Sequence, residues 1–127
     1  EEICSPLFQL YEETLLQLQQ GKQVELNLRI FEKNLLSHLG YGLLLTEEAL
    51  TRAPIVADAY YQYDIECGFR RVSSQLAGTL VCRGESILAL HNEILTSDQQ
   101  RQEVKRLMRQ VIAHYLNGRA LKSRDLI

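Results

Sequence analysis

The chain has 127 residues, of which 46% are hydrophobic, with 7 Gly and 2 Pro. This composition predicts one globular domain over residues 1–127 and excludes a disordered or fibrous chain. No apolar run approaches the ~20 residues that cross a bilayer, and no secretory leader is recognisable, so we expect no membrane contact. Three scattered cysteines fit a reducing, cytoplasmic compartment. Because the sequence begins at Glu1 without a Met, we expect an excised fragment.

The formal net charge of −2 conceals an asymmetry along the chain. Residues 101–127 carry seven Lys or Arg and two acidic residues, a balance of +5. Residues 1–100 carry seven basic and fourteen acidic residues, a balance of −7. A basic C-terminal end on an acidic body can bind one polyanion locally. It is not the composition of a protein that coats DNA generally.

Two helices are predicted in the first third of the chain. Ser5 and Pro6 open the first helix, with a capping hydroxyl before a proline at the first helical position, and Gly21 stops it. A second helix runs from about residue 24 to 39 and ends at Gly40. Its predicted buried face carries apolar side chains at helical spacing, namely Val24, Leu28, Phe31, Leu35 and Leu39. Because the connecting loop is short, we expect an antiparallel helical hairpin.

In the middle of the chain, the apolar residues no longer recur at helical spacing. Residues 61–72 alternate poorly and carry aromatic side chains and a Gly, which favours a small β-hairpin or an irregular insert. Residues 80–82 fit a short extended segment, and residues 86–91 fit a short helix. The predicted fold class is therefore mainly α, a helical domain with a small β-hairpin or irregular insert.

The last long helix has the clearest signals. Ser97 with Gln100 three residues later forms a capping box, and Gly118 ends the helix. Its apolar stripe consists of Val104, Leu107, Met108, Val111, Ile112, Tyr115 and Leu116. Of the whole chain, the side chains predicted to be mostly buried are Leu28, Phe31, Leu35, Leu39, Leu107, Val111 and Ile112.

A row of cations lies along one face of this helix. Arg101, Lys105 and Arg109 are four residues apart, so they share one helical face, and Arg106 lies beside them. The positive charge continues past the helix end in Arg119, Lys122 and Arg124. Clustered cations bind phosphates because each contact releases condensed counterions. The alternative is a solvated face with cations near the negative end of the helix.

A second pair of cations, Arg29 and Lys33, lies at the rim of the second helix's predicted apolar face. A groove edged by a cation suits an acidic peptide that ends in an aromatic residue and a free carboxylate. The alternative is that Arg29 pairs with Glu25 one turn earlier, which is worth only ~0.3–0.5 kcal/mol.

Catalytic and metal signals are weak. His38 occupies the last turn of its helix, where it favours the helix dipole, and no nucleophile with an orienting acid is apparent around it. The cysteines form no C-x-x-C pair, and no phosphate-cradling glycine motif occurs. We therefore expect no metal, no cofactor and no enzymatic activity.

Two segments together point to a family. Residues 28–42 read LRIFEKNLLSHLGYG, and residues 115–127 read YLNGRALKSRDLI. They resemble the C-terminal part of RecO, the bacterial recombination mediator, in which a helix ending in L-x-x-H-L-G-Y-G precedes a late Y-L-x-G-x-x-L-K-S-R segment. The resemblance implies a helical domain that follows an N-terminal OB-fold, which is absent from this sequence. Some members of that family carry a zinc insert with four cysteines. This sequence lacks the paired cysteines of those members, so it looks like the zinc-free branch.

The resemblance also implies a function and partners. Family members anneal complementary strands and, with RecR, help load recombinase onto DNA covered by single-stranded-DNA-binding protein. They dock on the acidic C-terminal tail of that protein, and Arg29, with Phe31 and Lys33 near it, looks like the docking site. Lys122 and Arg124 resemble the family's basic tail. We thus expect a cytoplasmic, nucleoid-associated docking module for DNA repair and recombination, with weak single-stranded DNA contacts. The alternatives are a small enzyme using His38 or Cys67 and a purely structural scaffold.

Overall fold

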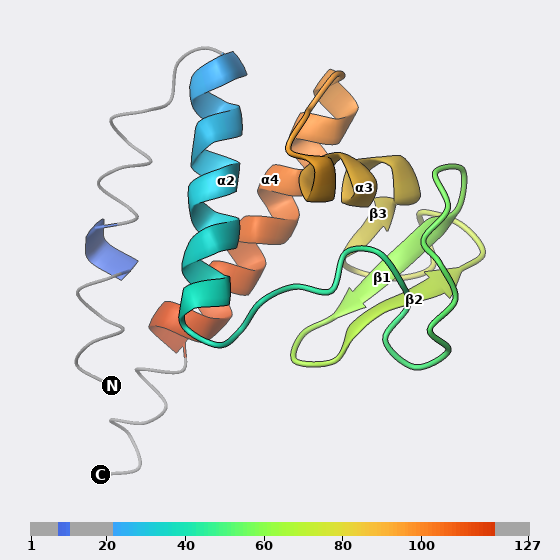
Figure 1. Cartoon of the computed structure of the whole chain (residues 1–127). Coiled ribbons are helices and arrows are strands. Elements are labelled where there is room, and N and C mark those ends of the chain that lie inside the picture. Colours follow the sequence, from blue (N-terminus) through green and yellow to red (C-terminus); the bar gives the residue numbers. More distant parts are fainter. Residues whose placement is uncertain (1–7, 11–21, 119–127) are drawn as a thin grey trace, which may run out of the picture.

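The computed structural model describes residues 8–10 and 22–118. Its elements, in chain order, are α2 (Lys22–His38), β1 (Tyr60–Asp64), β2 (Gly68–Val72), β3 (Val81–Arg83), α3 (Gly84–Asn92), α4 (Asp98–Ile112) and the π-helix η1 (Ala113–Gly118). Helices α2 and α4 lie on one side of the molecule and the small sheet on the other, with α3 next to β3 (Figure 1). The predicted fold class, mainly α with a small β insert, is confirmed. The first predicted helix lies outside the described residues, except for residues 8–10, which are helical.

Helix α2 ends at the predicted glycine stop. Gly40 adopts a φ of 91°, a left-handed conformation that glycine reaches without a Cβ penalty. Its N–H donates to the Ser37 carbonyl at 3.1 Å, and the Tyr41 N–H donates to the Leu36 carbonyl at 2.8 Å. These two bonds satisfy the last carbonyls of the helix, as in a Schellman motif. The chain then leaves the helix and crosses to the sheet (Figure 1).

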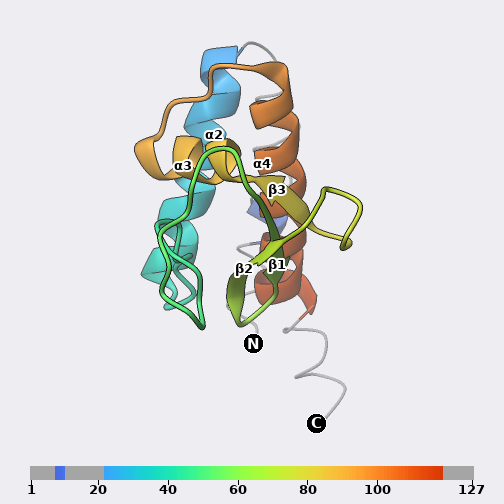
Figure 2. The same cartoon turned by 90° about the vertical axis from the view of Figure 1, so that its right-hand side faces the viewer.

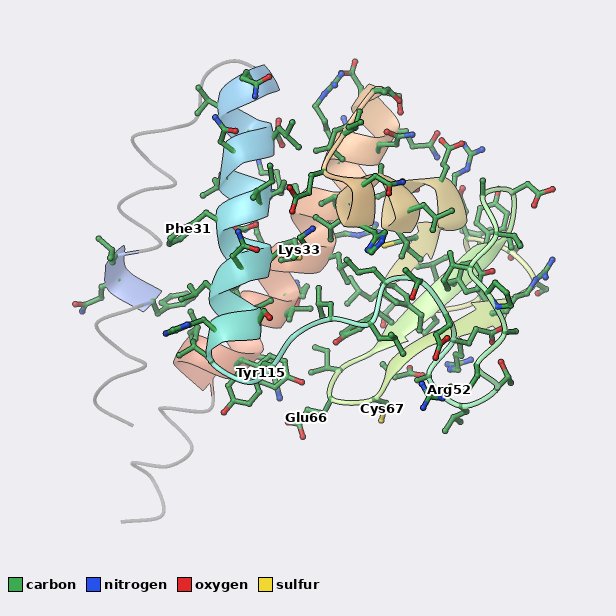
Figure 3. All side chains as sticks on the ribbon, viewed as in Figure 1. Phe31, Lys33, Arg52, Glu66, Cys67 and Tyr115 are labelled. Carbon is green, nitrogen blue, oxygen red and sulfur yellow. The ribbon has the colours of Figure 1, made fainter. Side chains whose placement is uncertain are left out.

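The buried face of α2 differs from the predicted one. Leu28, Glu32 and Leu36, four residues apart, are buried, and Arg29 joins them. Phe31, predicted to be buried, is 41% exposed and lies on the side of α2 that faces away from α3 and the sheet (Figure 3). The prediction was wrong because it excluded charged residues from the core. The structure accommodates the charges of Arg29 and Glu32 by pairing them with each other.

The middle of the chain forms a three-stranded antiparallel sheet in the order β2-β1-β3. Strands β1 and β2 pair from Tyr60 with Val72 to Asp64 with Gly68, which confirms the hairpin. The predicted extended segment at residues 80–82 overlaps β3, whose Cys82 pairs with Tyr61 of β1. The predicted short helix at residues 86–91 lies within α3.

The outer edge of β2 is covered by the loop that precedes the sheet. The Ala49 N–H donates to the Phe69 carbonyl at 3.0 Å, and the Arg71 N–H donates to Glu48 Oε1 at 3.1 Å. Unpaired strand edges are templates for aggregation, so these contacts protect the sheet.

The start of α4 bears out the capping prediction in part. Ser97 Oγ accepts a hydrogen bond from the Gln100 N–H at 3.1 Å. The Gln100 side chain, however, accepts from the Thr96 N–H at 2.8 Å, one residue earlier than a reciprocal capping box requires. Both bonds still satisfy donors near the helix start. At its other end α4 continues into η1, which ends at Gly118.

Helix α4 is the central element of the domain. It runs beside α2 and in the same direction, and it packs against α3 and β3 on its other side (Figures 1 and 2). The whole apolar stripe predicted for this helix and its extension is buried, namely Val104, Leu107, Met108, Val111, Ile112, Tyr115 and Leu116. Leu28 is also buried, whereas Leu35 and Leu39 are half-buried against the core. In the described part of the chain, no helix is long and apolar enough to span a membrane.

Candidate nucleic-acid interface

The solvent-facing side of α4 presents three cations, because the apolar stripe turns the opposite side inward. Lys105, Arg106 and Arg109 are all exposed. Within residues 22–118, neither Lys105 nor Arg109 forms an ion pair. Their charges are thus available to an anionic ligand.

Arg101, the first member of the predicted row, is placed differently. Its side chain is 11% exposed and forms an ion pair with Asp98, one turn earlier. Its Nη1 also donates to the Leu95 carbonyl at 3.5 Å. Arg101 therefore stabilises the start of α4, and its charge is offset before any ligand arrives. The three tail residues of the predicted site, Arg119, Lys122 and Arg124, lie outside the described residues.

Arg106 and Glu103 close the outer edge of β3. Arg106 Nη2 donates to the Val81 carbonyl at 2.7 Å, and the Arg83 N–H donates to Glu103 Oε1 at 3.0 Å. The same oxygen of Glu103 accepts from Ser86 Oγ at 2.7 Å. Sequence reasoning placed Arg106 beside the cation row but missed this role, because the partner carbonyl belongs to a strand 25 residues away.

Three hollows in the described surface meet at Arg106. The largest, about 500 Å³, lies between β1, the end of the β2–β3 connection and α4. A second, about 380 Å³, lies beside the edge of β3, and a third, about 310 Å³, lies along the exposed side of α4. Lys105 and Arg109 line the third hollow together with Arg106. The cation row thus borders concave surface.

Cys82, under this edge, is chemically protected. Burial and the nearby Glu103 carboxylate raise the pKa of its thiol to about 12, against a smaller lowering effect of Arg106. The thiol therefore stays protonated at neutral pH. Burial likewise raises the pKa of Tyr63, which borders the largest hollow, with Tyr115 and Cys67 adding to the effect.

The second predicted site, on α2, has its cations engaged inside the domain. Arg29 is 1% exposed, and its Nε lies 3.1 Å from Glu32 Oε1. The expectation that Arg29 lies on a rim was wrong, and so was the alternative of a pair with Glu25. Lys33 points toward α3 (Figure 3), where its Nζ lies 2.7 Å from Glu93 Oε2 and donates to the Leu90 carbonyl at 3.2 Å.

The alternative site, at Cys67, lies in the hairpin turn. Cys67 is exposed and lines a hollow of about 430 Å³ with Tyr41 and Tyr115, whose rings stack 4.2 Å apart (Figure 3). The adjacent Glu66 lies 2.5 Å from His114 Nε2. Within the described ranges, no hydrogen bond joins Cys67 or His38 to a second catalytic group, and no three His, Cys, Asp or Glu side chains cluster as metal ligands.

The fold and this surface define a mainly helical module with a small sheet and a cationic face. The chain matches the family described as Recombination protein O C terminal over residues 1–125. It is 42% identical over 123 residues to the DNA repair protein RecO of Methylococcus capsulatus and 41% identical over 122 residues to that of Nitrosococcus oceani. The alignments cover 97% and 95% of this chain.

The chain therefore belongs to the RecO family and represents its C-terminal part. A third relative, the DNA repair protein RecO of Coxiella burnetii, is 37% identical over 123 residues. The chain spans about half the length of these relatives, since the alignments cover 50%, 49% and 52% of them.

Proposed function

We propose that this chain is a non-enzymatic module of a DNA repair and recombination mediator, and that α4 supplies auxiliary contacts to nucleic acid. The observation that carries the proposal is the free cationic face of Lys105 and Arg109 in a chain that belongs to the RecO family. Phosphate contacts made by such cations are independent of base sequence and sensitive to salt. In the full-length protein the face would assist strand annealing.

A salt titration tests this proposal. Binding of the 127-residue chain to a labelled single-stranded oligonucleotide is measured by fluorescence anisotropy at several salt concentrations. The logarithm of affinity should fall with the logarithm of salt by about 0.7 for each phosphate contacted. The double variant Lys105→Gln/Arg109→Gln should flatten that slope.

The matched control changes the same net charge elsewhere. Arg52 and Arg71 are exposed and line none of the hollows around Arg106, so Arg52→Gln/Arg71→Gln also removes two surface cations. This control should leave the slope near that of the parent. Equal slopes for the parent and the Lys105/Arg109 variant would contradict the proposal and show that this face of α4 is only a solvated surface.

We also propose that the module docks the acidic C-terminal tail of single-stranded-DNA-binding protein on α2, and that it acts with RecR in loading recombinase. What supports docking is the family resemblance of the Arg29 segment, which also carries the exposed Phe31 ring. Arg29 Nη1 is buried and has no hydrogen-bond partner among the described residues, so it retains a donor for a carboxylate. Because Glu32 holds Arg29 inside the domain, docking requires the peptide carboxylate to reach this ion pair.

Peptide binding to α2 variants tests the docking site. Phe31→Ala removes an exposed ring and should weaken binding of the tail peptide without unfolding the domain. Lys33→Ala should weaken binding less and mainly alter its salt dependence. Arg29→Ala should cost ~1.5–3 kcal/mol of binding, the range of a charge-assisted hydrogen bond, measured on the folded fraction only. If Phe31→Ala and folded Arg29→Ala both bind like the parent, α2 is not the docking site.

A further inference from the structure

The three hollows around Arg106 share this side chain as part of their lining. Arg106 lines all of them, so a ligand in one hollow is adjacent to the next. Its guanidinium is held in place by the bond from Nη2 to the Val81 carbonyl at 2.7 Å. That bond uses one of five N–H donors, which leaves others for a ligand. An arginine fixed in this way is pre-organised to bind a planar or anionic group.

The charges around Arg106 favour an anion. Two carboxylates line the hollows, and both are engaged within the domain. Asp64 accepts from Arg70 Nε at 2.7 Å, and Glu103 accepts from a backbone N–H and from the Ser86 hydroxyl. The cations Lys105 and Arg109, in contrast, have no ion pair among residues 22–118. Arg70 offsets the charge of Asp64, and the three cations Lys105, Arg106 and Arg109 outnumber the remaining carboxylate of Glu103, so the net charge of the hollows is positive.

The largest hollow has a mixed lining. Ile65 and the buried Leu80 and Tyr63 supply apolar surface, and the exposed Thr79 and Gln110 supply hydrogen-bonding groups. A hollow that combines apolar and hydrogen-bonding side chains suits a flat heterocycle such as a nucleobase. Its volume of about 500 Å³ is in the range of small-molecule pockets.

We propose that this surface binds a single, unpaired nucleic-acid strand, with a phosphate at Arg106 and the adjacent base in the largest hollow, which Thr79 and Gln110 line. A base in a duplex is stacked and paired, so a duplex could contact only the cations on the exposed side of α4. The inference rests on the proposed contact between α4 and nucleic acid, and it adds the position of the base and a preference for unpaired strands.

The test compares two probes of equal charge, namely a short thymidine oligonucleotide and an abasic oligonucleotide of the same length. The parent chain should bind the thymidine strand roughly five- to tenfold more tightly, because only that strand can fill the hollow. Thr79→Trp and Gln110→Trp, at two exposed positions that line the hollow, should remove this preference by filling it. Gln99 lines only the second hollow, so the control variant Gln99→Trp should retain the preference.

The salt slope separates failure of this inference from failure of the proposed function. Both Trp variants should keep the parent's slope, whereas Arg106→Gln should weaken binding of both strands. If the parent binds the two probes equally, or if both folded Trp variants keep the preference, no base occupies the hollow and the inference is wrong. If the Lys105/Arg109 variant also leaves the slope unchanged, the contact between α4 and nucleic acid itself is wrong.

Discussion

Arg29 and Glu32 form an ion pair that is sealed inside the domain, with side chains 1% and 0% exposed and Arg29 Nε 3.1 Å from Glu32 Oε1. Burying two charges is costly, and their mutual attraction only partly repays the loss of hydration. Such a pair contributes little net stability, but removing one partner leaves the other charged and buried. The pair thus links the folding of α2 to any binding role of Arg29.

The first prediction follows from this link. Arg29→Ala should destabilise the domain by ~3–5 kcal/mol, because it breaks a buried ion pair by removing the cation 3.1 Å from the Glu32 carboxylate. The double variant Arg29→Met/Glu32→Met should recover much of that loss by replacing both charges with apolar side chains. Urea unfolding followed by circular dichroism measures both. A double variant as unstable as Arg29→Ala would show that the pair itself is not the cause.

Phe31 and Leu36 provide a second prediction. Leu36 is fully buried, so Leu36→Ala should cost ~2–5 kcal/mol. Phe31 is 41% exposed, so Phe31→Ala should cost only about 1 kcal/mol. The order of the two losses in stability checks the orientation of α2. It is obtained from the denaturant midpoints of the two variants, provided that their m-values are equal. Phe31→Ala as the more damaging change would contradict that orientation.

A third prediction compares two glycines with different amounts of space around them. A Cβ on Gly84 would lie 1.7 Å from the Val56 carbonyl oxygen, a contact that backbone cannot relieve cheaply. Gly84→Ala should therefore destabilise the domain by ~1–3 kcal/mol or more. At Gly42 the nearest atoms would lie 3.5 Å away, so Gly42→Ala serves as the tolerated control. Thermal unfolding of both variants makes the comparison.

Glu103 provides a fourth prediction. Its carboxylate accepts bonds from the Arg83 N–H at 3.0 Å and from Ser86 Oγ at 2.7 Å. Glu103→Ala should cost ~1.5–3 kcal/mol, the range for bonds to a charged group, and should speed hydrogen exchange at the Arg83 amide. Glu48→Ala, on the opposite sheet edge, should instead affect the Arg71 amide. Exchange that is unchanged at both amides would contradict this account of the sheet edges.

The cysteines provide a fifth prediction, measured in a Cys4→Ser background. Cys67 is exposed and should react readily with a thiol reagent, whereas Cys82 should react only after unfolding. The pKa of Cys82 is raised from 9.0 to about 12, so its stabilising effect is complete below pH 9. That effect is lost as the pH rises toward 12, because the unfolded chain releases the proton first. Similar labelling rates for the two thiols in the folded protein would contradict the burial of Cys82.

The sequence by itself determined the elements that depend on local chemistry. The glycine stop at Gly40, the serine cap at Ser97 and the apolar stripe of α4 each follow from neighbouring residues, so pattern and spacing were sufficient. The family also followed from sequence, because two local segments carry it. Lys105 and Arg109 are exposed, as expected from the sequence, because the apolar stripe of α4 turns the opposite side of the helix inward.

Only the tertiary structure decided which face of α2 is buried and where the cations act. Hydrophobic spacing placed Phe31 inside and Arg29 at the rim, but pairing with Glu32 allowed Arg29 to enter the core. Lys33 contacts α3, and Arg106 contacts β3, across long separations in sequence. Such contacts depend on how elements pack against one another, which the spacing within one helix does not specify.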